Sequence, residues 1–375
     1  SRYDNWAGIQ SRLARRGVAP RRVEDREYTG VVPYGYHLDA NAFAHFLKGI
    51  SIKRGVQHVV SHVDDVEVND GKISQLHMKD GKKIKADLWV DCTGFAARLI
   101  SALGAEFQSS SARLLVDSAV TCQVHGEEIK TRPFTTATAR SSGWTFDIDL
   151  QTRGGRGYVY SSDHISADDA FREFSEAYPG QIDEDRAKHF KLRVGRMNKS
   201  WIGNCCAIGL SAGFLEPMES TGLYFVEYTA RLFVEALQGL DDDNMALHAD
   251  WFSDAYSGLF DEVEAFIEMH YKMSDRQDTP FWKDAVAAEK SDILERYITL
   301  WQSRLPSSFD FSSHSFFGPE SWQAILFGLG WRPKKSHRIA AINTKKGITH
   351  YKELNGHADR ISLQNPAHKS YLQVP

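Results

Sequence analysis

The segment at residues 205–237 constrains the fold of this 375-residue chain more than any other part of it. A short apolar run, Cys205–Leu210, leads into a Gly-rich loop, and the loop leads into a helical pattern. Ser220 or Thr221 is the natural N-cap of this helix, and Gly222 lets another molecule approach the backbone closely. Because a helix N-terminus presents unpaired N–H groups and the positive end of a dipole, the segment predicts an anion site.

The predicted helix carries an apolar stripe, and a carboxylate comes directly before it. The stripe has the three- and four-residue spacing of one helix face: Leu223, Val226, Ala230, Phe233 and Leu237. Glu219, directly before the helix, is the unusual residue. Its negative charge could simply stabilise the positive end of the helix dipole. The favoured interpretation is a functional carboxylate beside the anion site, and the structural interpretation stays open.

Composition excludes several classes of function. The formal net charge is −4 and no Lys/Arg stripe is visible, which disfavours nucleic-acid binding. No apolar run approaches the roughly 18–20 residues that span a bilayer, and the polar start is not a signal peptide. The cysteines lack zinc spacing, so we expect no metal site and four reduced, buried thiols in a cytoplasmic protein: Cys92, Cys122, Cys205 and Cys206.

The rest of the chain predicts mixed secondary structure. Residues 1–35 look irregular, and Asp39 then caps a helix whose apolar face is Phe43, Phe46, Leu47 and Ile50. Two Asp-Gly turn signals, at 70–71 and 80–81, separate three short runs of a β-meander at 66–68, 73–78 and 84–90. We expect further strands at 114–162, helices at 220–303, and a surface helix with an extended tail after 334.

One string within residues 205–237 is specific to a protein family. The residues Phe214-Leu-Glu-Pro-Met-Glu-Ser-Thr-Gly-Leu-Tyr-Phe225 resemble the signature of flavin-dependent halogenases of the tryptophan-halogenase type. Further matches occur in the family's order along nearly the whole chain, at 36–39, 86–95, 115–120, 157–162, 194–196, 270–271 and 276–282. So many collinear matches would not arise by chance.

The resemblance implies an α/β (α+β) fold and an oxidoreductase of the monooxygenase class. Residues 1–225 would be the remaining part of a two-nucleotide-type, Rossmann-like FAD module with a β-meander and a mixed sheet. Residues 226–375 would be a helical region that covers the substrate. Family members use FADH2, supplied by diffusion from a separate flavin reductase, with oxygen and chloride or bromide to form hypohalous acid. That acid travels through a tunnel to a small aromatic substrate. The assembly stays open, with a homodimer as the candidate.

The resemblance also assigns roles to residues around the anion site. Glu219 matches the catalytic glutamate and Ser220 the serine between the flavin and substrate sites. Thr221 and Gly222 match the halide-binding backbone, in agreement with the helix-terminus argument.

Four more residues match the flavin side of the family's site. Leu210 and Leu223 match positions that flank the isoalloxazine ring. Asp91 and Gly94 belong to a strand-end turn where the backbone approaches the cofactor. A plain strand-ending turn is an equally good interpretation of that pair.

The chain departs from the family pattern in its aromatic segments. Trp144 is kept in the tunnel-wall string, whereas Phe146 replaces a second Trp and Asp149 replaces a Pro. By resemblance, Trp144 and Phe146 would still form an aromatic barrier and line the substrate pocket. A compact stretch at 316–330 replaces the insertion that clamps free tryptophan, so another indole or a phenol is an equally good substrate. Three aromatic residues there would line a pocket or pack in the core: Phe316, Phe317 and Trp322.

The Gly-x-Gly-x-x-Gly turn for flavin phosphates is the largest departure. Gly155-x-Gly157 is followed at the third position by Tyr160, and Gly328-x-Gly330 by Pro333, so neither fits. No lysine can be assigned the role of the family's essential lysine either, and we expect little turnover from these residues alone. A halogenase that continues beyond this sequence is favoured; a related flavin monooxygenase and a non-catalytic remnant that binds aromatics are the alternatives.

Overall fold

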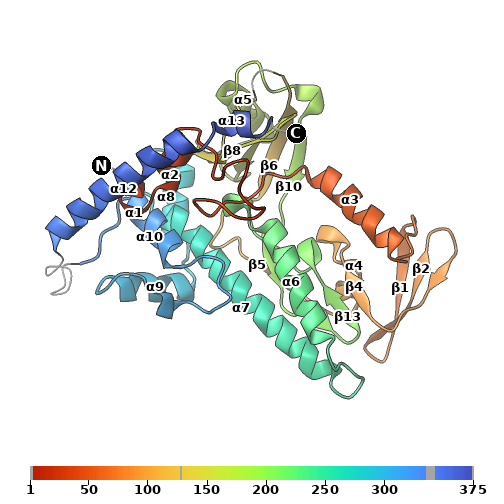
Figure 1. Cartoon of the computed structure of the whole chain (residues 1–375). Helices are drawn as coiled ribbons and strands as arrows, with labels where there is room; N and C mark the ends of the chain where they lie inside the picture. The colour runs from red at the N-terminus through yellow and green to blue at the C-terminus, as the bar shows by residue number, and fades with distance from the viewer. Residues whose placement is uncertain (1–2, 127–128, 335–342, 374–375) are drawn as a thin grey trace.

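A computed structural model describes residues 3–126, 129–334 and 343–373 (Figure 1). It contains an antiparallel five-stranded sheet, three smaller three-stranded sheets, and a long helical segment that packs against them. The mixed α/β class and the order of its parts confirm the fold expected from the sequence. No helix of the described residues is long and apolar enough to cross a membrane.

The five-stranded sheet accounts for the strands expected at 114–162. Its strand order is β10-β6-β9-β8-β7, with all neighbours antiparallel. The strands are β6 (Ser118–Val124), β7 (Thr136–Ala139), β8 (Gly143–Asp149), β9 (Gly154–Tyr160) and β10 (Lys188–Lys191). Helix α5 (Ala167–Ala177) packs on β6 and β9, where Phe174 joins Val120 and Tyr158 in a buried cluster. On β8, Phe146 lies directly opposite Gly157 of β9.

The expected meander is present, but its third run is divided. It consists of β1 (Val63–Asn69), β2 (Lys72–Met78) and β3 (Lys83–Ile84), paired antiparallel. The rest of the 84–90 run is β4 (Trp89–Asp91), which leaves the meander and pairs in parallel with β13 (Cys205–Ala207). Strand β12 (Trp201–Ile202) completes that sheet, and β5 (Phe107–Ser109), β11 (Gly195–Met197) and β14 (Gly213–Phe214) form another.

Helices follow the sheets, as expected for 220–303. They are α6 (Gly222–Ala236), α7 (Met245–Lys272), α8 (Pro280–Ala287), α9 (Asp292–Trp301) and α10 (Pro319–Gly328). Figure 1 shows α6 lying beside the much longer α7. The main core includes residues on both sides of position 225, from Ile73 of β2 to Ala285 of α8. The expected division of the chain at 225 stays a prediction.

The buried face of α6 is not the predicted stripe. Phe225, Thr229 and Ala236 are buried, whereas Leu223 and Val226 are exposed. The helix carries apolar residues on neighbouring faces, so periodicity located the helix and packing against α7 selected the face. The apolar stripe seen in the sequence is therefore not the face that packs on the core.

The two ends of the chain and the cysteines differ in part from what the sequence predicts. Residues 1–35 contain two short helices, α1 (Asp4–Ala7) and α2 (Gln10–Arg15), because Leu13 is buried against the C-terminal helix α12 (Thr344–Gln364). The short helix α13 (His368–Tyr371) follows α12, and part of the expected tail lies outside the described residues. The expectation of four buried thiols was wrong for Cys92, which is exposed because it follows the end of β4; the other three cysteines are buried.

The helix predicted after Asp39 is also confirmed. It is α3 (Ala40–Lys53), and the Asp39 side chain accepts hydrogen bonds from the backbone N–H groups of Asn41 and Ala42. None of its described residues is buried, and its apolar side chains Phe46 and Leu47 are exposed. Capping therefore located this helix correctly, and its apolar face is not packed on the core in the described structure.

We predict that Gly157→Ala lowers the free energy of unfolding by about 1–3 kcal/mol, because an added Cβ would overlap the ring of Phe146. Gly155→Ala in the same strand is the matched control, since its Cβ would come no closer than 3.8 Å to another residue, at the Ile148 carbonyl oxygen. Urea unfolding of both variants measures the difference. Equal effects at the two positions would contradict the proposed overlap.

Candidate functional site

A strained turn precedes α6. The chain leaves β13, forms the short 3₁₀ helices η3 (Gly209–Ser211) and η4 (Met218–Ser220), and then enters α6. Glu219 and Ser220 have φ values of 65° and 54°, in the left-handed region that residues other than glycine rarely adopt. Such strain persists only where the surroundings enforce it, and it concentrates at functional sites. Both residues predicted to be catalytic therefore lie in the strained part of the turn.

The N-terminus of α6 remains available to an anion. Thr221 is the N-cap residue, and no side-chain hydrogen bond caps the helix in the described structure. The backbone N–H of Phe225 donates to the carbonyl oxygen of Thr221 at 2.9 Å. Gly222 is exposed, and a Cβ added there would meet nothing within 4 Å. The unpaired N–H groups of this turn thus form the kind of terminus that binds anions.

Helix α7 contacts the turn through two adjacent residues. His270 places its Nε2 2.9 Å from Oε1 of Glu219. The hydroxyl of Tyr271 donates to Oε2 of Glu216 at 2.8 Å. The sequence marked 270–271 only as a family match and gave Glu216 no role. A glutamate in an apolar stretch could have signalled the buried carboxyl, whereas nothing in the sequence indicated that His270 meets Glu219.

Glu216 is an unusual buried acid. Its side chain is 0 % exposed, and burial raises its pKa to about 7, against the lowering effects of Tyr271, Trp144 and His270. The indole of Trp144 on β8 is buried beside this carboxyl, although no hydrogen bond of ordinary geometry satisfies its Nε1. The predicted aromatic barrier and the strained turn are therefore in contact through a carboxyl that the sequence analysis missed.

Of the residues predicted on the flavin side, Asp91, Gly94 and Leu210 lie at or just beyond the carboxyl ends of two parallel strands, and Leu223 lies in the first turn of α6. β4 ends at Asp91, and β13 leads into η3, which contains Leu210. In open α/β sheets, ligands bind outside these strand ends. Leu210 and Leu223 are 45 % and 56 % exposed, so both present apolar surface to a ligand.

The side chain of Asp91 is committed to the protein itself. It is fully buried, and its oxygens accept from the backbone N–H groups of Thr93, Leu99 and Ile100. The Ser211 hydroxyl is shared between Asp91 and the Gly94 carbonyl, at 3.1 and 3.2 Å. Any contact of this turn with a cofactor would therefore come from its backbone, at Gly94, where φ is 73°.

The three C-terminal aromatic residues have different surroundings. Phe316 packs against Tyr224 of α6, with ring centroids 3.9 Å apart. Phe317 stacks on Phe266 of α7, also at 3.9 Å. Trp322 is 0 % exposed within an aromatic cluster, which matches core packing and leaves its side chain no surface for a ligand. Of the five predicted pocket residues, Trp144 and Phe146 lie on β8 and the other three lie beside α6 and α7.

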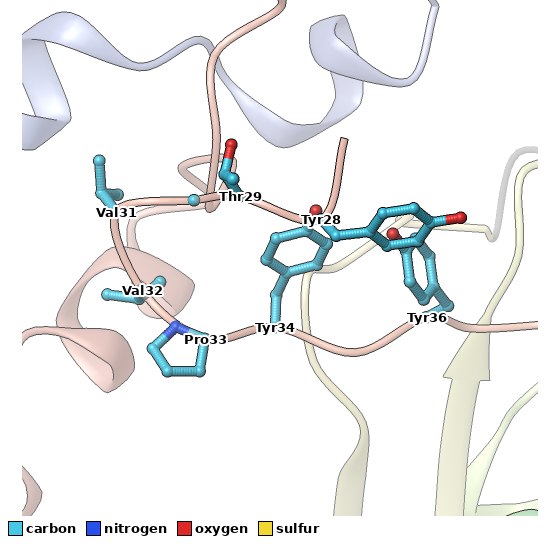
Figure 2. A pocket seen from close by; sticks show the side chains of 8 residues that line it. Tyr28, Thr29, Val31, Val32, Pro33, Tyr34 and Tyr36 are labelled. Atoms are coloured by element: carbon cyan, nitrogen blue, oxygen red, sulfur yellow. The ribbon is translucent and has the colours of Figure 1, made fainter. Parts of the chain in front are cut away.

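A surface hollow of about 540 Å³ lies elsewhere, along residues 28–36. Figure 2 shows the rings of Tyr28, Tyr34 and Tyr36 gathered at one end of it. None of its lining residues was a predicted site residue, and the turn before α6 does not contribute to it. The hollow therefore gives no support to the site described above.

We predict that Glu216→Gln reduces the pH dependence of stability. Because the folded-state pKa is about 7 and the ordinary value is 4.5, the folded protein keeps this proton between those pH values while the unfolded chain releases it. The stability associated with it is full below about pH 4.5 and is lost as the pH rises to about 7, by roughly 3 kcal/mol. Urea unfolding at about pH 5 and 7.5 measures this loss, which should be smaller in the variant.

Glu235→Gln, at an exposed position of α6, controls for the loss of one surface carboxylate. Burial also raises the pKa of Glu268 to about 7, so a residual slope of the same sign should remain in Glu216→Gln. The same pH dependence in Glu216→Gln and in the unmodified protein would rule out a protonated Glu216 carboxyl.

Comparisons with known proteins identify the family. A family model described as tryptophan halogenase matches residues 3–345. The tryptophan 6-halogenase SttH of Streptomyces toxytricini is 38% identical over 349 residues, which cover 90% of this chain and 66% of that protein. The 7-chloro-L-tryptophan 6-halogenase KtzR of Kutzneria sp. is 34% identical over 361 residues, which cover 95% of this chain and 70% of that protein. The chain thus spans about two thirds of the length of these relatives.

Solved structures agree with the sequence relatives. The SttH structure has a TM-score of 0.91 at 33% identity. The match covers 99% of this chain and 76% of the SttH chain. BrvH, a flavin-dependent halogenase from Brevundimonas sp., has a TM-score of 0.88 at 30% identity. The match covers 98% of this chain and 75% of the BrvH chain. The chain therefore belongs to the tryptophan halogenase family and has the fold of its flavin-dependent enzymes.

Proposed function

We propose that this chain carries the halide and substrate sides of an FADH2-dependent halogenase that acts on an electron-rich aromatic ring. The observation that carries the proposal is the left-handed Glu219-Ser220 turn, which joins an exposed carboxylate directly to an uncapped helix N-terminus. An anion-binding helix end and a positioned base would serve, respectively, to hold the halide and to assist ring substitution. Family membership supports the proposal.

The α6 terminus would hold the halide. Chloride and bromide are monovalent anions, and the N–H groups of Thr221 and Gly222 can donate to them at the positive end of the helix dipole. Burial of Thr221, which is 5% exposed, reduces competition from water. Glu219 lies two residues from this point, so one turn would link the halide to the base.

The ends of β4 and β13 would hold the flavin ring. Leu210 and Leu223 offer exposed apolar side chains, and the Gly94 backbone can approach a planar group closely. These residues fit FAD, and FADH2 from a separate reductase would supply the reducing equivalents with which oxygen converts halide into hypohalous acid. The side chains of Asp91 and Ser211 keep the turn in place.

Glu219 would act at the aromatic ring. Electrophilic substitution adds the halogen to a ring carbon and then releases the proton from that carbon, and a carboxylate within reach can accept it. Trp144 of β8 is buried beside Glu216, and the partly buried ring of Phe146 next to it would present aromatic surface to the substrate. With Trp322 in the core, the substrate class we propose is an electron-rich arene, such as an indole or a phenol.

We predict that bromide binds at the N–H groups of Thr221 and Gly222. Crystals of the protein with FAD, soaked in bromide, should give an anomalous peak at this helix terminus. Excess chloride should remove the peak, since both ions would use the same N–H groups. Bound flavin without any bromide peak at the α6 terminus would refute the halide site.

We predict that Glu219→Gln lowers formation of the halogenated ring by about 10²–10⁴-fold, the usual contribution of a general base. Hypohalous acid should still form, because this carboxylate acts after the halide is oxidised. The assay supplies chemically reduced FAD, halide and tryptophan to the full-length protein, and follows both a hypohalite trap and the ring product.

Glu227→Gln, on the exposed side of α6, is the matched control and should retain product formation. An unchanged product rate in Glu219→Gln would remove Glu219 from the mechanism. A parallel loss of trapped hypohalite would move its action to the flavin side.

A further inference from the structure

We propose that His270 is the positioning residue of Glu219: it is protonated on both ring nitrogens and fixes the carboxylate by donating from Nε2. The inference deepens the proposed function and rests on it, because positioning matters only if Glu219 acts on the substrate. The geometry of the imidazole itself carries it.

Both hydrogen bonds of His270 are satisfied when each ring nitrogen carries a proton and Glu219 is a carboxylate. Nδ1 lies 3.0 Å from the carbonyl oxygen of Phe266, and a carbonyl can only accept, so Nδ1 must donate. Nε2 lies 2.9 Å from Oε1 of Glu219, and a carboxylate likewise only accepts. A neutral imidazole has a single N–H, so it would turn a lone pair towards one of these oxygens. The imidazolium form satisfies both.

The position of His270 in α7 favours its positive charge. The residue lies in the last turn of the helix, where the partial negative charge of the helix dipole stabilises cations. The titratable groups that face it from the turn are Glu219 and Glu216, both carboxyls. On α7 itself, the neighbours are Tyr271 and the Phe266 carbonyl.

Packing fixes the ring in one orientation. Within residues 263–272 of α7, His270 is the one residue that is not buried. Its ring extends from this buried part of the helix to Glu219 in the exposed turn. The Phe266 ring meets the imidazole edge-on, with centroids 5.3 Å apart, and Phe317 stacks on Phe266 with centroids 3.9 Å apart. The C-terminal aromatic cluster would therefore support Glu219 through His270.

A second contact from α7 holds the same turn at Glu216, three residues before Glu219. Tyr271, next to His270, donates to the buried Glu216 at 2.8 Å. Adjacent helix residues point about 100° apart, so the two contacts approach the turn from different directions. Tyr271 anchors the backbone of the turn, and His270 fixes the side chain that would react.

The protonation state is measured directly by ¹⁵N NMR on full-length protein labelled at histidine. We expect the His270 signals, assigned by their loss in His270→Gln, to show protons on both nitrogens at neutral pH. In Glu219→Gln, the new amide can donate to Nε2, so that nitrogen should lose its proton while Nδ1 keeps its own. A resting Nε2 without a proton, or no response to Glu219→Gln, would overturn the proposal.

His164 is the matched internal control. Its Nε2 lies 3.0 Å from Asp284, but its Nδ1 faces the Ser161 hydroxyl, which can donate as well as accept. Its signals should not change in Glu219→Gln. A shift of His164 equal to that of His270 would show a general structural change and would count against a specific pair.

Product assays test the positioning role separately. His270→Phe keeps a ring against Phe266 but removes both donors, so the ratio of ring product to trapped hypohalite should fall by ~10²-fold. His270→Gln retains one donor for Glu219 and should recover part of this loss. Ring-deuterated tryptophan should show a primary isotope effect in His270→Phe that exceeds that of the unmodified protein, since loss of the ring proton becomes limiting.

The outcomes separate the two proposals. If Glu219→Gln leaves product formation unchanged, the proposed function of Glu219 fails, whereas the NMR result on the pair is independent of it. If Glu219→Gln reduces product formation and His270→Phe does not, the positioning role of His270 is overturned. Circular dichroism and thermal melting confirm that each variant is folded.

Discussion

The hydrogen bond from Tyr271 to the buried carboxyl of Glu216 anchors the turn on which the site depends. Helix α7 passes through the core, and this bond ties the segment between β14 and α6 to it. Leaving a buried acid without its donor costs about 1–3 kcal/mol, so the contact is costly to break. With the turn held there, Glu219 and Ser220 can remain in a left-handed conformation that their own side chains disfavour.

Asp91 plays the corresponding part on the flavin side. One buried carboxylate satisfies the start of α4 (Arg98–Ala102), closes the turn after β4, and reaches Ser211 in η3. The parallel pairing of β4 with β13 brings these two segments together, although more than a hundred residues separate them in the chain. The strand ends, the α6 terminus and the strained turn thus form one continuous region, because two buried carboxyls hold its parts.

Several parts of the fold could be predicted because they depend on local chemistry. Asp39 caps a helix with its own side chain, and the Asp70-Gly71 pair supplies the positive φ values of a tight hairpin turn. Other parts depended on distant partners. The run after residue 84 divides because Trp89–Asp91 pairs with β13, and the buried face of α6 follows from its contact with α7. Periodicity alone could not select between neighbouring apolar faces.

By itself, the sequence determined the family, the order of the secondary-structure elements, and the helix terminus that follows Glu219. Those features lie within short segments, where residue type and spacing fix the backbone. Only the tertiary structure decided that Glu216 is buried, that Trp322 belongs to the core, and that His270 meets Glu219. Burial and hydrogen-bond partners depend on which distant segments pack together, and a linear pattern does not contain that information.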